Sequence, residues 1–235
     1  MAMPAAIDAM LDKLEEMGFS AGEVNIFLNL KLRERAEQEA FVKVAVLECN
    51  PENLSQLCEQ LRQDSSIELY SYLLDNVSRY PYNLDEDMDL VVTTMAHAEA
   101  LLKVLPDPEK LSKVAVRLTE QTVTDLVRIK PGSRVGILTV SQRFGDLLQE
   151  ALSRYNPQAI FQMPELLDAT LDAEIYLGNK DVVLVPFGYE KYCSAKAARV
   201  LEQSGKLLLC GYEMDAGSAM YLKERLEQLK RAKEL

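Results

Sequence analysis

The stretch "FVKVAVLECNPENLSQLCEQL", residues 41–61, decides the class of fold. It begins with a nearly continuous apolar run, reaches Glu48, Cys49 and Asn50, and continues through Pro51 into a segment with leucines on one helical face. A continuous apolar run is typical of a strand buried on both faces of a parallel sheet, and proline is favoured in the first turn of a helix. The stretch therefore predicts a buried strand that leads directly into a helix.

The same pattern recurs along the rest of the chain. "DLVVTTMAHAEALL", residues 89–102, predicts a second such passage from strand to helix. Further strands are predicted at residues 67–74, 113–118, 134–141, 159–164, 181–186 and 206–211. Alternation of apolar strands with helices is typical of α/β proteins. We therefore predict two α/β lobes, each a mostly parallel sheet flanked by helices; one continuous doubly wound sheet is the alternative.

The first 40 residues show a helical pattern without the alternating strands of the rest of the chain. Residues 5–17 carry an apolar stripe at helical spacing, Gly18 ends that segment, and Ser20 with Glu23 forms a capping-box pattern that opens a second helix. We predict an N-terminal helical connector or dimerisation segment at 1–40. Lobe 1 then spans 41–118 and lobe 2 spans 119–235, with the last helix packing back on lobe 1.

Charge and cysteine content exclude several classes of protein. The net charge is −11, from 37 acidic and 26 basic side chains, and such a surface repels phosphate backbones. The four cysteines show no CxxC spacing, which favours a reducing compartment. No segment resembles a signal peptide or the ~18 apolar residues of a membrane span. We expect a cytoplasmic protein that contacts neither membranes nor, by itself, DNA.

Candidate ligand-binding residues follow from the predicted strand ends. Ligands of open parallel sheets lie beyond the carboxyl ends of the strands, where helix N-termini present unpaired N–H groups. These helix ends, the hydroxyl groups and Arg143 favour a small anionic or zwitterionic ligand. The residues expected to bind it are Glu48, Cys49, Asn50, Thr93, Thr94, His97, Ser141, Gln142, Arg143 and Phe187.

Several of these residues also have a purely structural interpretation. Asn50, Thr94 and Ser141 are all suitable helix caps. His97, the only histidine, would lie in a first helical turn, where histidine is commonplace. Arg143 opposes the dipole of the helix that it begins, so it needs either a bound anion or a carboxylate from elsewhere in the chain.

Enzyme signatures are absent from the sequence. It contains no GxSxG, Walker or GxGxxG motif, and a single histidine cannot build a multi-histidine metal site. We therefore expect a non-catalytic chain with no metal and no cofactor. One catalytic alternative is an isomerase or racemase in which Cys49 and Cys210 form a proton-transferring thiol pair.

Two segments carry a resemblance to a known family. "VLECNPENLSQLCEQL" and "DLVVTTMAHAEAL…KVAVRLTEQTVTDLVRIKPGSRVGILTVSQRFGDLLQEAL" resemble the C-terminal effector-binding region of a subset of GntR-like bacterial transcription regulators. The resemblance covers most of residues 41–155. It implies a two-lobed domain similar to periplasmic binding proteins, with residues 48–50, 93–97 and 141–144 facing the cleft. No winged-helix segment precedes Phe41, so the chain is expected to be an isolated effector domain or a relative that has lost DNA binding.

The function expected from these observations is that of an effector-sensing domain. It would bind a small molecule between its lobes, form a homodimer, and reach DNA only through a domain absent from this chain. Besides the isomerase, a dimerisation module without a ligand is the remaining alternative.

Overall fold

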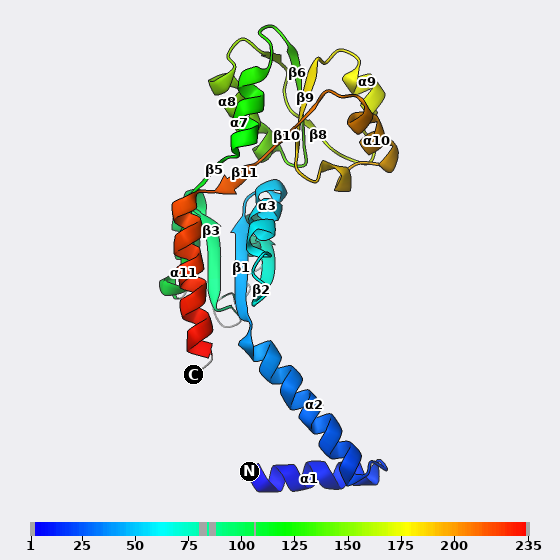
Figure 1. Cartoon of the computed structure of the whole chain (residues 1–235), viewed down its shortest axis with the longest axis vertical. Coiled ribbons are helices and arrows are strands. Elements are labelled where there is room, and N and C mark those ends of the chain that lie inside the picture. The colour runs from blue at the N-terminus through cyan, green and yellow to red at the C-terminus, as the bar shows by residue number, and fades with distance from the viewer. Residues whose placement is uncertain (1–2, 80–83, 85–87, 106, 234–235) are drawn as a thin grey trace.

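Two α/β lobes and a projecting pair of helices make up the chain (Figure 1). The computed structural model describes residues 3–79, 84, 88–105 and 107–233, without the side chains of residues 3–5 and 33–40. The prediction of an α/β fold with parallel sheets flanked by helices, preceded by a helical segment, is confirmed.

The sheet of the first lobe contains four parallel strands in the order β2-β1-β3-β4. Its strands are β1 (Val42–Glu48), β2 (Ile67–Leu73), β3 (Leu90–Thr94) and β4 (Leu111–Val114). Leu47 of β1 pairs with Thr93 of β3, so the polar residues after both strands meet at one edge of the sheet.

Both faces of this sheet are covered, which explains the continuous apolar run of β1. One face carries α3 (Pro51–Leu61) and α11 (Ala216–Lys233), whose leucines pack on Val42, Val44 and Val46. The other face carries α6 (Met95–Leu102) and α4 (Leu74–Arg79), and it buries Ala45 and Leu47. A 3₁₀ turn, η1 (Pro108–Lys110), precedes β4. The last helix of the chain thus returns to the first lobe.

The second lobe repeats this layout. Its parallel strands are β6 (Arg134–Thr139), β7 (Ile160–Phe161), β8 (Glu165–Leu166), β9 (Val182–Pro186) and β10 (Leu207–Cys210), in the order β10-β9-β6-β7, with β8 also paired to β6. Its helices are α7 (Glu120–Arg128), α8 (Gln142–Tyr155), α9 (Ala173–Leu177) and α10 (Ala195–Gln203), with the 3₁₀ turn η2 (Tyr189–Lys191). α7 and α8 cover one face, and α9 and α10 cover the other.

A short antiparallel ribbon joins the lobes. It consists of β5 (Val116–Leu118) and β11 (Tyr212–Met214), through which the chain passes once in each direction (Figure 1). The sequence predicts one strand at 113–118, but the structure divides it at Ala115. The backbone N–H of Ala115 donates to Ser218 Oγ and its carbonyl accepts from Asp215, so the strand leaves the sheet and crosses to the other lobe.

Two other segments differ from the prediction. The single strand predicted at 159–164 is replaced by the two-residue strands β7 and β8, with Pro164 between them. The strand predicted at 67–74 ends at Leu73, and helix α4 directly follows it, although no helix is predicted there from the sequence; part of the segment between α4 and β3 lies outside the described residues.

The helical pair consists of α1 (Met3–Glu16) and α2 (Ala21–Ala40), and it projects from the first lobe (Figure 1). The predicted capping box is confirmed, since Ser20 Oγ accepts from the backbone of Glu23 and the Glu23 carboxylate accepts from the backbone of Ser20. Among the described helices, none has the length and apolar character needed to cross a membrane.

Candidate functional site

A cavity of about 730 Å³ lies between the two lobes. It lies beside the ribbon of β5 and β11 that joins the lobes, which we call the hinge ribbon. Lobe 1 contributes the residues that follow β1 and β3, lobe 2 contributes one face of α8, and the hinge contributes Val116 and Tyr212. Cavities of roughly 300–1,000 Å³ are typical of small-molecule sites. The carboxyl edge of the lobe 1 sheet, where the sequence predicts ligand-binding residues, lines this cavity, and the cavity is the candidate site.

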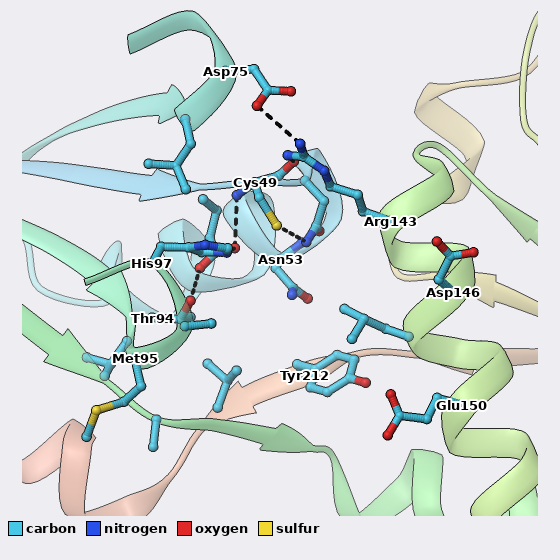
Figure 2. A pocket seen from close by; sticks show the side chains of 18 residues that line it. Cys49, Asn53, Asp75, Thr94, Met95, His97, Arg143, Asp146, Glu150 and Tyr212 are labelled. Carbon is cyan, nitrogen blue, oxygen red and sulfur yellow. Dashed lines mark hydrogen bonds and ion pairs between the residues drawn. The ribbon is translucent and has the colours of Figure 1, made fainter. Parts of the chain in front are cut away.

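The polar centre of the lobe 1 wall consists of Glu48, Cys49 and His97. Figure 2 labels Cys49 and His97. The Glu48 carboxylate is almost fully buried, and its Oε1 accepts from Thr94 Oγ1 at 2.5 Å. His97 Nε2 lies 3.5 Å from Glu48 Oε2, which also accepts from the backbone N–H of Cys49 at 3.1 Å. The three side chains come together because β1 and β3 are neighbouring parallel strands and His97 follows in the first turn of α6.

Electrostatic coupling holds this cluster in a charged form. Burial opposes ionisation of Glu48, but hydrogen bonds from His97 and Thr94 outweigh it and lower the pKa of the carboxyl. The contact with His97 lowers the pKa of the Cys49 thiol. Contacts with Cys49 and Glu48 in turn raise the pKa of His97 to about 10. At neutral pH this wall therefore carries a His97 imidazolium beside the Glu48 carboxylate.

The N-terminus of α6 adds a positive pole to the same wall. Its cap residue, Thr94, makes no side-chain hydrogen bond to the first-turn amides, and its hydroxyl donates to Glu48 instead. Met95 and Ala96, the first two residues of α6, line the cavity. Unpaired N–H groups at a helix N-terminus attract anionic groups.

The lobe 2 wall is acidic. Arg143, Asp146 and Glu150 lie at helical spacing on the face of α8 that lines the cavity (Figure 2). Leu147, from the same helix, also lines it. The Arg143 guanidinium reaches across to lobe 1, where it donates to the carbonyl of Cys49 and to Asp75. Asp146 accepts from Gln142 and Glu150 lies near Arg154, so both carboxylates remain on the α8 side of the cavity.

Two further side chains shape the floor between these walls. Asn53 is only 6% exposed, lines the cavity, and has no hydrogen-bond partner for its Oδ1. A buried acceptor without a donor is costly, and a ligand N–H or O–H would satisfy it. Tyr212 packs edge-on against Phe144, and burial raises the pKa of its phenol to about 12, which keeps the hydroxyl neutral.

A buried carboxylate connects the lobes behind the cavity. Glu52, in the first turn of α3, is 3% exposed and reaches the turn between β6 and α8. Its Oε1 accepts from the backbone N–H groups of Val140 and Ser141 at 2.7 and 2.8 Å, and its Oε2 accepts from Ser141 Oγ at 2.7 Å. The N-terminus of α8, an expected anion site, is thus occupied by a carboxylate of the chain itself.

The structure brings six of the ten predicted ligand-binding residues to the cavity. These are Glu48, Cys49, Asn50, Thr94, His97 and Arg143. Asn50 also caps α3, since its side chain accepts from the backbone N–H of Asn53. Arg143 forms an ion pair with Asp75, which supplies the carboxylate expected for a cation in the first turn of a helix.

The other four predicted residues lie outside the cavity lining. Thr93 is buried and donates to the carbonyl of Leu47, while Ser141 caps α8 and contacts Glu52. Gln142 is exposed and donates to Asp146. Phe187 follows β9 and lies against Gly211, at the end of the neighbouring strand β10.

Sequence reasoning missed the acidic face of α8 and the role of α3. The spacing of Arg143, Asp146 and Glu150 could have indicated the former, since the apolar residues of the same helix define its opposite face. Asn53 lies one turn after Asn50 and could have been found in the same way. The contact of Glu52 with Ser141 joins residues 89 positions apart, and no local pattern indicates it.

Proteins similar to this chain include one domain family and one solved structure. A family model described as the YmtS Rossmann-like domain matches residues 136–233, which span the second lobe from β6 onward together with α11. Among solved structures, an NtrC family transcriptional regulator from Clostridium acetobutylicum matches 82% of this chain and 98% of its own, with 15% sequence identity and a TM-score of 0.34. A search of curated proteins finds no match.

We predict that Glu52→Gln lowers the free energy of unfolding by about 1–3 kcal/mol, because an amide cannot accept all three hydrogen bonds that the carboxylate receives. Urea denaturation at neutral pH measures this change. Glu59→Gln is the matched control, since Glu59 lies on the same helix, is exposed, and forms an exposed ion pair with Lys191 of lobe 2. The control should change stability by less than about 0.5 kcal/mol. Equal effects of the two substitutions would contradict the role assigned to Glu52.

Proposed function

We propose that the chain is a small-molecule sensing domain whose ligand binds in the cavity between the lobes. The observation that carries the proposal is the composition of the cavity wall, which comes from both lobes and contains a buried acceptor, Asn53 Oδ1, without a partner. A ligand that contacts both walls binds the closed arrangement more tightly than an open one. It therefore shifts the balance between the two arrangements, which is the physical basis of sensing.

The charges of the cavity favour a zwitterion over a purely anionic ligand. On lobe 1, the first-turn amides of α6 suit a carboxylate. On lobe 2, Asp146 and Glu150 suit an ammonium or another cationic group. A ligand that carries both groups would satisfy the two walls at once, whereas a simple anion would be repelled by α8.

The resemblance of residues 41–155 to effector-binding regions leads us to place this sensing domain in a transcription regulator. With a net charge of −11, the chain is poorly suited to contact DNA through its own surface. DNA binding would therefore belong to another domain or another protein, and the movement of the lobes would reach it through α2, which leads into β1.

The position of Cys210 argues against the alternative of an isomerase that uses Cys49 and Cys210 as a pair of thiols. Cys210 is fully buried in the core of the second lobe, and burial raises the pKa of its thiol to about 12. It does not line the cavity into which Cys49 faces. Cys210 is therefore unsuited to exchange a proton with a substrate bound there.

The sensing proposal is tested by differential scanning fluorimetry of the full chain against small metabolites grouped by charge. Zwitterions should raise the melting temperature, since a ligand at 100 times its Kd adds about 2.7 kcal/mol to stability. Asp146→Asn combined with Glu150→Gln should weaken zwitterion binding at least about tenfold, equivalent to ~1.4 kcal/mol. Glu202→Gln, an exposed change on α10, is the control. The proposal fails if no charge class shifts the melting temperature, or if the double variant responds as the wild type does.

We further propose that the chain forms a homodimer through α1 and α2. Large apolar side chains of this helical pair are exposed, and a groove of about 380 Å³ lies between the helices. The exposed side chains are Ile7, Met10, Leu11, Met17, Phe19, Ile26, Phe27, Leu28, Leu30 and Leu32. The pair contacts the body of the chain mainly through α2 and α11, so a second copy of the pair would cover this apolar surface as a helical bundle.

Light scattering of the full chain tests the dimer. We expect twice the chain mass for the wild type and a single chain mass for Phe27→Asp, because a buried charge would disrupt the bundle. Val127→Asp, on an exposed position of α7, should remain a dimer. A monomeric wild type, or a dimeric Phe27→Asp variant, would overturn this part of the proposal.

A further inference from the structure

Three potential metal ligands of different chemistry meet at the lobe 1 wall of the cavity. The side chains are Glu48, Cys49 and His97, and their ligating oxygen, sulfur and nitrogen atoms all lie within 4.8 Å of one another. The Glu48 Oε2–His97 Nε2 distance is 3.5 Å. Ligands of a tetrahedral zinc ion, with bonds of about 2.0–2.3 Å, are separated from each other by about 3.3–3.8 Å. Small side-chain adjustments would therefore bring all three atoms to bonding distance.

We propose that Glu48, Cys49 and His97 bind a zinc ion, with a fourth coordination position directed into the cavity. The donor set identifies the metal. Thiolate and imidazole ligands suit Zn²⁺, whereas Mg²⁺ and Ca²⁺ require six or more oxygen ligands. The carboxylate and the thiolate supply two negative charges, which balance the charge of the ion.

The backbone positions these ligands on rigid elements. Glu48 ends β1, Cys49 follows it directly, and His97 lies three residues after the end of β3. Both strands are fully covered by helices, and the pairing of Leu47 with Thr93 fixes their relative register. Ligands held on buried strand ends lose little conformational entropy when they bind a metal.

Neighbouring polar groups orient two of the ligands. The hydroxyl of Thr94 donates to Glu48 Oε1, which leaves Oε2 as the oxygen that faces His97. Asn50 Nδ2 lies 3.5 Å from Cys49 Sγ and donates to the sulfur. Hydrogen bonds of this kind fix the geometry of metal ligands and are characteristic of established metal sites.

The position of the cluster determines what the metal could do. All three ligands line the cavity, so the fourth position is accessible to water or to a donor atom of a small molecule. Three protein ligands with one accessible position are typical of zinc sites that bind exogenous groups, in contrast to closed structural sites. Any role of the metal in holding an effector rests on the sensing function proposed above, but zinc binding itself does not.

The proposal is tested with the full chain after treatment with a chelator, in buffer that contains no organic ligand. Isothermal titration with Zn²⁺ should give one ion per chain. Substitution with Co²⁺ should produce visible d–d bands of tetrahedral intensity and a near-ultraviolet thiolate-to-cobalt charge-transfer band, which only a cysteine ligand can supply. Cys49→Ser should abolish that band, and His97→Gln should weaken zinc binding by about 100-fold or more.

Cys193→Ser is the matched control, because Cys193 is a partly exposed thiol of lobe 2 that lies outside the cavity lining. It should bind zinc and retain the charge-transfer band as the wild type does. Circular dichroism of the metal-free variants checks that each one folds, and the wild-type cobalt spectrum remains decisive if one does not. The absence of one-to-one zinc uptake, or of the thiolate band in the wild type, would overturn the proposal. Because no organic ligand is present, either result leaves the metabolite screen to be judged separately.

Discussion

The hydrogen bonds of Glu52 are the interaction on which the arrangement of the two lobes depends. Its carboxylate is buried between them and satisfies two backbone N–H groups and a hydroxyl at the start of α8. Gln56 and Gln60 follow at four-residue spacing on α3 and accept from the backbone of Tyr212 and Met214 in the hinge ribbon. One face of a single helix thereby positions both the opposite wall of the cavity and the strand that forms its floor.

This arrangement gives the cavity two chemically different walls. Lobe 1 presents the cluster of Glu48, Cys49 and His97 together with the N-terminus of α6, and lobe 2 presents the carboxylates of α8. Arg143 is the exception, since it belongs to lobe 2 but bonds to lobe 1. A ligand with charges of both signs, or one that donates an atom to a metal at the cluster, would make contacts on both sides of the cavity.

Much of the architecture could be predicted because it depends on local patterns. The apolar run of β1, the proline at the start of α3 and the capping box of α2 each reflect interactions between residues close in the sequence. The carboxyl strand ends also indicated Glu48, Cys49, Thr94 and His97 as candidate ligand-binding residues, and all four line the cavity. The carboxyl ends of parallel strands lie at a common edge of the sheet, so the pattern of strands along the sequence was sufficient to predict that these residues lie close together.

The remaining features depend on contacts between distant parts of the chain. The break at Ala115 is caused by hydrogen bonds with Asp215 and Ser218, about 100 residues later, which a strand pattern cannot reveal. The partner of Arg143 could be expected to be an anion, but the choice of Asp75 follows from the unpredicted helix α4. Likewise, the carboxylates of α8 face the cavity because contacts between distant residues, those of Glu52 and of Arg143, join that helix to lobe 1.

Amide hydrogen exchange at Val140 and Ser141, followed residue by residue with NMR, tests the central claim most directly. Both N–H groups donate to Glu52 across the lobe interface, so they exchange freely only when the lobes separate. A ligand bound in the cavity should slow exchange at these two positions together with that of the residues that it touches. If a ligand protects the cavity residues but leaves Val140 and Ser141 unchanged, binding is not coupled to closure of the lobes, and the account is contradicted.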